Sequence, residues 1–120
     1  MALSVCPHRV GGFPVISVAG ELDVTNADQL GDAVERALDD LPSTLVVDLG
    51  DVTFIDSAGV HAVVRPRTMM VTLRTRLHVV ADADQVRETF ALMGLADTVP
   101  LHRTLDGALR CAAGRHPEPA

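Results

Sequence analysis

The alternation of apolar and polar positions along the chain predicts short strands and helices in regular succession. The sequence VGGFPV at 10–15 separates two short apolar runs, which indicates a β-hairpin. A strand is then expected at 14–20. Residues 26–41 carry apolar side chains at helical spacing with acidic residues between them, so we expect a helix capped by Thr25 or Asn26.

The next segment, STLVVDLG at 43–50, is almost continuously apolar and rich in β-branched residues. That pattern is typical of a central strand buried on both faces. A second helix is expected to begin near Ser57 and to run from 58 to about 64. Pro66 then predicts a kink or a break, because proline lacks the backbone N–H that a helix interior needs.

The last third of the chain continues the same alternation. We expect a strand at 76–81, a helix with an Asp cap at 82–95, a short extended piece at 97–101 and a last helix from Thr104 to about Ala113. The order β-β-α-β-α-β-α-β-α is typical of an α/β fold with a mixed or mostly parallel sheet and helices packed on it.

Length and composition favour one domain. The 120 residues suffice for a single hydrophobic core, and we expect the domain at 1–113 and a flexible, proline-rich tail at 114–120. The sequence contains no run of 18 apolar residues, so no membrane span is predicted. No secretory signal is visible either. These features predict a cytoplasmic protein with no membrane partner. They favour reduced thiols at Cys6 and Cys111, and a single disulfide between the two stays an alternative.

The charge is unevenly distributed along the chain. Residues 1–60 hold ten acidic residues and two arginines, a net charge of −8, whereas residues 61–120 hold six and eight, a net charge of +2. An acidic N-terminal half disfavours nucleic acid and suits a basic protein partner. The chain also lacks Trp and Tyr, aromatic residues on which single-stranded nucleic acids stack. We therefore expect no nucleic-acid partner.

The stretch TFIDSAGV at 53–60 interrupts the apolar pattern with Asp56, Ser57 and Gly59. Ser57 has three possible roles: a helix N-cap, a nucleophile, or a hydroxyl that receives a phosphate. As a cap, its hydroxyl would accept from amides of the first helical turn. Asp56 can cap the helix equally well, which would leave Ser57 free.

The nucleophile role has weak support. A serine between strand and helix resembles the nucleophile elbow of hydrolases, but Ile55 stands where that motif has glycine. His61 lies one helical turn after Ser57 and could act as a base, yet no Ser-His-acid set is fixed by the spacing.

Metal and cofactor sites also have little support in the sequence. Cys6 and His8 form one short pair, with no second pair at ligand spacing. His78 is expected on or beside a strand, whereas His8, His102 and His116 are expected at the periphery. No glycine-rich phosphate loop occurs. We therefore expect no metal and no cofactor.

The phosphoacceptor role is compatible with the neighbouring residues, and the cap stays an alternative. A phosphate on Ser57 would lie at a helix N-terminus, where backbone amides stabilise an anion. Ala58 and Gly59 add little bulk, and we expect Gly59 to let a partner's backbone come close. The modification would add about 1.5 to 2 negative charges beside Asp56. Those charges would repel an acidic or tightly fitted partner, which makes a switch of binding and not of folding.

Two segments carry a resemblance to a known family. LVVDLGDVTFIDSAGVHAVV at 45–64 resembles the phosphorylation segment of bacterial anti-anti-sigma factors, which belong to the STAS domain family. VISVAGELDVTNADQL at 15–30 resembles the strand, acidic loop and first helix that precede it. The resemblance covers about 3–112. It implies the STAS fold, a mixed sheet of four or five strands flanked by about four helices.

The resemblance also implies a function without catalysis. Such a protein is an anti-sigma factor antagonist: when unphosphorylated, it binds an anti-sigma factor that is also a serine kinase, and a sigma factor is released. Phosphorylation ends the binding, and a phosphatase resets the switch. Ser57 aligns with the phosphoacceptor. The residues expected to contact the partner are Glu21, Asp23, Thr25, Asp56, Ala58, Gly59 and His61.

The expected state is a monomer that forms heteromeric complexes. One alternative is a STAS-like subunit of a lipid-transport or sensory complex, and a weaker one is a small serine hydrolase. The chain departs from the family pattern after the second helix, which Pro66 interrupts. Four arginines cluster there, either as a solvated face or as a site for an acidic partner or phosphate; they are Arg65, Arg67, Arg74 and Arg76.

Overall fold

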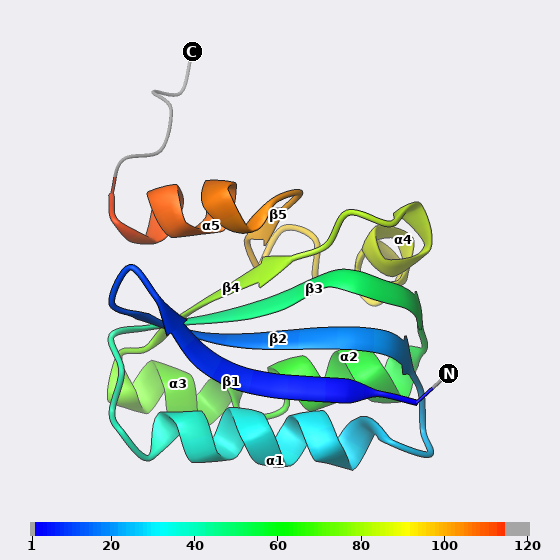
Figure 1. Cartoon of the computed structure of the whole chain (residues 1–120), viewed down its shortest axis with the longest axis horizontal. Coiled ribbons are helices and arrows are strands. Elements are labelled where there is room, and N and C mark those ends of the chain that lie inside the picture. The colour runs from blue at the N-terminus through cyan, green and yellow to red at the C-terminus, as the bar shows by residue number, and fades with distance from the viewer. Residues whose placement is uncertain (1, 115–120) are drawn as a thin grey trace.

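The five strands lie in one sheet in the order in which they occur along the chain (Figure 1). The computed structural model describes residues 2–114. The first two strands pair antiparallel through a turn at Gly11 and Gly12, which both have positive φ, and the other neighbours pair parallel. The strands are β1 Ser4–Val10, β2 Phe13–Leu22, β3 Thr44–Ile55, β4 Arg76–Val80 and β5 Leu101–His102. The predicted mixed sheet and its hairpin are therefore confirmed.

Helices cover both faces of the sheet. In Figure 1, α1, α2 and α3 lie below the strands and α5 lies above them. The helices are α1 Ala27–Leu38, α2 Ser57–Val64, α3 Arg67–Leu73, α4 Asp84–Leu92 and α5 Leu105–Ala112. The order of strands and helices is the expected one, with the second helix divided in two.

Alternating strand residues enter two separate apolar clusters. Ile16 and Val47 belong to the large cluster that contains residues of α1, α2 and α4. Val15 and Val46, their chain neighbours, belong to a smaller cluster with Val80 and Ala108 of α5. Since successive strand side chains point to opposite faces, the central strands are buried on both sides. This burial confirms the interpretation of the apolar run at 43–50, and the strand continues to Ile55.

Pro66 divides the second helix as predicted. α2 ends at Val64, and Pro66 takes the N-cap position of α3, where its missing N–H is not needed. The Pro66 carbonyl accepts from the Met70 amide at 2.9 Å. α3 ends at Leu73, and its C-cap Arg74 has a φ of 59°, in the left-handed region.

Of the predicted caps, one is confirmed, one is correct in position but makes no side-chain hydrogen bond, and one is wrong. Asn26 occupies the N-cap position of α1, but its side chain makes no capping hydrogen bond. The helix predicted at 82–95 begins at Asp84, and its N-cap is Ala83 instead of an aspartate. Thr104 does cap α5, because its hydroxyl accepts from the Gly107 amide at 3.0 Å. Caps depend on local backbone angles, which the sequence indicates only weakly.

The extended piece predicted at 97–101 is also mostly wrong. The amides of Thr98 and Val99 donate to the Leu95 carbonyl, which makes a turn there. Only Leu101 and His102 pair with β4.

The last helix, α5, ends at Ala112, one residue before the predicted end at about Ala113. The tail predicted at 114–120 lies, apart from Gly114, outside the described residues.

Both cysteines are free thiols: Cys6 is exposed on β1 and Cys111 is half-buried on α5. Within residues 2–114, no helix is long and apolar enough to cross a membrane.

Candidate functional site

The acidic loop after β2 and the start of α2 meet at one edge of the sheet. β2 and β3 are parallel and in register at their ends, with Leu22 beside Ile55. Parallel strands that end at the same level bring their following loops together. The loop that follows β2 therefore lies beside the start of α2, where Ser57 stands.

Asp56 joins these two loops through both of its carboxylate oxygens. Oδ1 accepts from the Gly59 amide at 3.0 Å, which caps α2, and Oδ2 accepts from the Val24 amide at 3.2 Å. The Asp56 amide in turn donates to the Leu22 carbonyl at 3.2 Å. One side chain thus fixes the start of the helix and the position of the neighbouring loop.

Ser57 is the first residue of α2 and is not its cap. The interpretation of Ser57 as N-cap is wrong, because Asp56 already fills that role. The Ser57 side chain is exposed, and its hydroxyl makes no hydrogen bond to any residue in the range 2–114. A hydroxyl in this position is accessible to a second protein and lies beside the amides of a helix start.

His61 also lies exposed on α2, one turn after Ser57. Within the described range its side chain has no hydrogen bond to Ser57 or to a carboxylate. A hydrolytic serine needs a base that is itself oriented by a third group. The geometry therefore gives no support to the serine hydrolase alternative.

Gly59 has a different role from the one expected. It is buried, and a Cβ there would lie 2.7 Å from Ile55 Cγ1 and 2.8 Å from Leu22 Cγ. The glycine lets α2 approach the ends of β2 and β3 inside the protein. The structure thus gives the missing side chain an internal packing role, and contact of Gly59 with a partner stays a prediction.

Gln85 of α4 holds the end of β3 from the side away from β2. Its side-chain oxygen accepts from the Ile55 amide at 3.0 Å, and its side-chain nitrogen donates to the Ile55 carbonyl at 2.7 Å. The amide side chain thus satisfies both backbone groups of Ile55, as a neighbouring strand would. Sequence reasoning missed Gln85, because nothing in the sequence places α4 beside this strand end.

The acidic loop is ordered by its own hydrogen bonds. Glu21 and Thr25 are exposed, and Asp23 is partly exposed. The Thr25 hydroxyl and then the Thr25 amide donate to Asp23, and these bonds lower the pKa of that carboxyl. Asn26 closes the loop by accepting from the Asp23 amide at 3.0 Å and donating to the Glu21 carbonyl at 2.9 Å. The loop therefore presents negative charge in a fixed shape.

A shallow groove of about 510 Å³ runs between α1 and α2 and begins beside Ser57. Its apolar part includes Val24, which is 75% exposed. Sequence reasoning expected Ala58 and His61 in a binding surface but missed the others. The lining residues are Val24, Ala27, Asp28, Ala58, His61, Ala62 and Arg65. The apolar Val24, inside an otherwise polar acidic loop, is the sequence signal that could have identified this groove.

The arginines after α2 do not act as one cluster. Arg65 lines the groove and pairs with Glu35 of α1 at 3.5 Å. Arg67 and Arg76 line another cavity, next to β4. Both residues of the Arg65–Glu35 pair are about half exposed, so the pair contributes little to stability.

The histidine pair on the other side of the sheet was not expected. His78 of β4 is 5% exposed, and its Nδ1 lies 3.0 Å from Nε2 of His102 on β5. The expectation that His102 lies at the periphery is wrong. The parallel pairing of β4 with β5 places the two side chains together, and the sequence indicated β5 too vaguely to show this.

The sequence of residues 7–108 matches the model of the STAS domain. The chain belongs to the STAS domain family. It is 32% identical over 114 residues to the anti-sigma-F factor antagonist RsfB of Mycobacterium tuberculosis, across 95% of this chain and 91% of that protein.

Solved structures of the STAS family share the fold. An anti-sigma factor antagonist from Mycobacterium paratuberculosis has a TM-score of 0.80 at 29% identity, covering 93% of this chain and 95% of that one. The unphosphorylated anti-sigma factor antagonist SpoIIAA has a TM-score of 0.77 at 22% identity, covering 92% and 97%. The predicted STAS fold is therefore confirmed, and the described part of the chain has five helices because Pro66 divides one of them.

Proposed function

We propose that this STAS domain protein is an anti-sigma factor antagonist whose binding is switched off by phosphorylation of Ser57. The observation that carries the proposal is the division of roles at the start of α2. Asp56 makes the structural hydrogen bonds, and Ser57 is left exposed without one. The relative RsfB, named as an anti-sigma-F factor antagonist, supports the choice of partner.

In the unphosphorylated form, the surface around Ser57 docks on the anti-sigma factor. The groove beside α2 offers Val24 and Ala58 as apolar contacts and His61 as a polar one. Glu21, Asp23 and Thr25 form the acidic rim of this surface. The net charge of −8 in residues 1–60 draws a basic partner to this side. Binding competes with the sigma factor, which is released.

The anti-sigma factor then acts as a serine kinase. The Ser57 oxygen attacks the γ-phosphorus of ATP, the bond to the β-phosphate oxygen breaks, and ADP leaves. The Asp56 oxygens are occupied by two backbone amides, so Asp56 is a positioning residue and the partner supplies the base that takes the hydroxyl proton. In this exchange our chain is a substrate and not an enzyme.

Phosphate on Ser57 changes the docking surface without unfolding the domain. Its charge lies at the positive end of α2 and is stabilised there by about 0.3–1 kcal/mol. The same charge stands beside Asp56 and the acidic rim, and it repels a partner that fitted the neutral hydroxyl. A phosphatase removes it and restores binding. We propose that this cycle runs in the bacterial cytoplasm, between a monomer and its protein partners.

The test is phosphorylation by the cognate anti-sigma factor. Incubation with that kinase and ATP should place one phosphate on the peptide that contains Ser57, as located by mass spectrometry. Ser57→Ala should remove the phosphate, whereas Ser43→Ala, at an equally exposed serine before β3, should not. Phosphate on another residue, or on the Ser57→Ala variant, would contradict the proposal. Capture of transport subunits and no kinase would favour the alternative assembly.

A further inference from the structure

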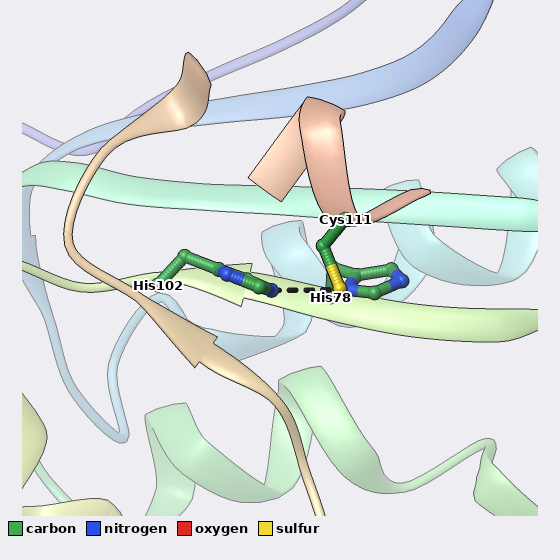
Figure 2. A group of neighbouring side chains, drawn as sticks. All are labelled: His78, His102 and Cys111. Atoms are coloured by element: carbon green, nitrogen blue, oxygen red, sulfur yellow. Dashed lines mark hydrogen bonds between the residues drawn. The ribbon is translucent and has the colours of Figure 1, made fainter. Parts of the chain in front are cut away.

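Three side chains from three elements converge on the face of the sheet that α5 covers. Figure 2 shows His78 of β4, His102 of β5 and Cys111 of α5 pointing toward one another. Each offers one ligand atom, and these atoms all lie within 4.8 Å of one another. His78 Nδ1 and His102 Nε2 are 3.0 Å apart. Sequence reasoning missed this group, since no metal-ligand spacing joins its members.

The fold itself brings the three residues together. His102 lies beside Val80 in the parallel pairing of β5 with β4. His78 precedes Val80 by two positions and therefore shares its face of the sheet. On that face Val80 contacts the cluster that includes Ala108, and Cys111 follows Ala108 by about one helical turn. The sheet register and the seating of α5 thus preorganise the group.

The two imidazole rings already face each other. Burial lowers the pKa of His78, and His102 and Arg76 lower it further. Burial, followed by the charge of Arg87, lowers the pKa of His102. One ring nitrogen donates to the other across the 3.0 Å gap. A neutral imidazole nitrogen is the commonest metal ligand in proteins.

We propose that His78, His102 and Cys111 form a binding site for a divalent transition-metal ion of the Zn²⁺ class. Two imidazoles and a thiolate are the ligands that such ions prefer, whereas Mg²⁺ and Ca²⁺ require oxygen. Three protein ligands leave one tetrahedral position for water or for an outside group. The inference does not rest on the proposed function, because Ser57 begins α2, on the other face of the sheet.

The spacing of the ligand atoms requires only a small adjustment. In a tetrahedral zinc site, nitrogen ligands lie about 3.4 Å apart, and nitrogen and sulfur lie about 3.6 Å apart. The ring nitrogens, now 3.0 Å apart, would separate by about 0.4 Å. The ring that donates the hydrogen bond would carry its proton on its other nitrogen instead, and the Cys111 thiol would release its proton to water, so that both nitrogens and the sulfur can bond to the metal. The Cys111 sulfur lies within 4.8 Å of both nitrogens, so it would have to move closer by up to about 1.2 Å.

The surroundings select against ions held by charge alone. Arg76 lies near His78 and Arg87 near His102, and both oppose a bound cation. The thiolate offsets one of these charges, and the remaining affinity must come from coordination bonds. A cavity of about 420 Å³ that includes His78 and Cys111 in its lining gives an ion a path to the ligands.

Cobalt titration tests the site on the full-length, reduced and chelator-treated protein. We expect one Co²⁺ per chain, with visible absorption of a tetrahedral site and a sulfur-to-cobalt charge-transfer band. Cys111→Ser should abolish that band and weaken binding at least about tenfold, and His102→Gln should weaken it similarly. Cys6→Ser and His8→Gln are the matched controls on β1 and should leave both unchanged.

A thermal measurement gives an independent readout. Zn²⁺ should raise the melting temperature of the parent protein and of Ser57→Ala, but not of Cys111→Ser, because a ligand that binds the folded state stabilises it. Circular dichroism checks that each variant folds. Absence of the charge-transfer band in the folded parent protein would overturn the proposal. So would its persistence in Cys111→Ser, or its loss in Cys6→Ser.

Discussion

Asp56 and His78 each stand at the centre of a polar group, the first where β2 and β3 end and the second on the face of the sheet that α5 covers. Around Asp56, backbone amides hold the carboxylate, and the neighbouring hydroxyl of Ser57 has no structural task. Around His78, side chains hold one another: an imidazole bonds an imidazole, with a thiol beside them. The first arrangement can be modified without loss of structure. The second can change only if the hydrogen bond between His78 and His102 is exchanged for bonds from both residues to one shared ligand.

Burial separates the two groups as well. Ser57 is exposed and lies where a protein the size of a kinase can reach it. His78 is 5% exposed, with its partners half-buried, so only a small ligand can reach the group. Exposure therefore sets the size of the ligand that can reach each group, and the hydrogen bonds of each side chain determine what can be altered there.

Among changes near Asp56 and Ser57, Gly59→Ala should have the largest effect on the free energy of unfolding. The added Cβ would lie under 3 Å from branch atoms of Ile55 and Leu22, which cannot easily move. Overpacking of this kind costs up to about 3 kcal/mol, of which the better helix propensity of Ala recovers up to about 1 kcal/mol. We therefore expect the free energy of unfolding in urea to fall by about 2 kcal/mol.

Gly107→Ala on the other face is the matched control. Gly107 takes the third position of α5, as Gly59 does in α2, but a Cβ there meets only the Thr104 hydroxyl at 3.2 Å. The change should be close to neutral. Equal losses for the two variants would show that the helix position, and not the packing against β2 and β3, explains Gly59.

A smaller loss is expected for Asp56→Ala. The variant removes the cap of α2 and leaves the Val24 amide to water, which should lower the free energy of unfolding by about 1 kcal/mol. Chemical denaturation measures it. Asp51→Ala, at an exposed carboxylate near the end of β3, should change stability by less than about 0.5 kcal/mol. Equal stability losses for Asp56→Ala and Asp51→Ala would show that the hydrogen bonds of Asp56 do not stabilise the site.

Ser57→Asp should alter stability less still. Negative charge at a helix start is favourable by about 0.3–1 kcal/mol, so the melting temperature should stay within a few degrees of the parent value. Binding to the anti-sigma factor, measured by calorimetry, should nevertheless weaken, whereas Ser43→Asp should bind normally. A large loss of stability would mean that Ser57 has a structural role after all.

The smallest effect concerns Thr25→Val and depends on pH. Hydrogen bonds from Thr25 lower the pKa of Asp23 below its ordinary value of 3.8, so the folded state favours the ionised form. That contribution is present above pH 3.8 and is lost as the pH falls through the lower folded-state pKa. The stability difference between parent and variant should therefore shrink in acid.

Thr72→Val is the control for the pH experiment. The Thr72 hydroxyl donates to the Thr68 carbonyl on α3, so no carboxylate is involved. Its effect on unfolding should be the same at neutral and acid pH. If Thr25→Val behaved the same way, the hydrogen bonds to Asp23 would not be stabilising its charge.

Much of the fold could be predicted from the sequence because its signals are local. The apolar run before Gly50 marked a strand buried on both faces, Gly11 and Gly12 marked the hairpin, and Pro66 marked the break between two helices. Asp56 beside Ser57 indicated that one of the two could cap while the other stayed free. Each of these inferences needs only the residues next to one another in the sequence and the periodicity of apolar positions.

The features that were missed depend on contacts between distant segments. Gly59 looked like an opening for a partner, but its neighbours Leu22 and Ile55 come from two different strands. Gln85 contacts Ile55 across 30 positions of sequence. His78 meets His102 only because β5 pairs with β4, and β5 is two residues long. No local sequence pattern indicates contacts of this kind.

The division of roles between Asp56 and Ser57 also has an evolutionary consequence. If the proposed function holds, a mutation of Ser57 to a small residue would leave the fold intact and produce a protein that phosphorylation cannot turn off. Selection for stability would not remove such a change, so the proposal makes regulation the reason for keeping the hydroxyl. Descendants of this chain could therefore lose regulation in a single step while remaining fully folded binders.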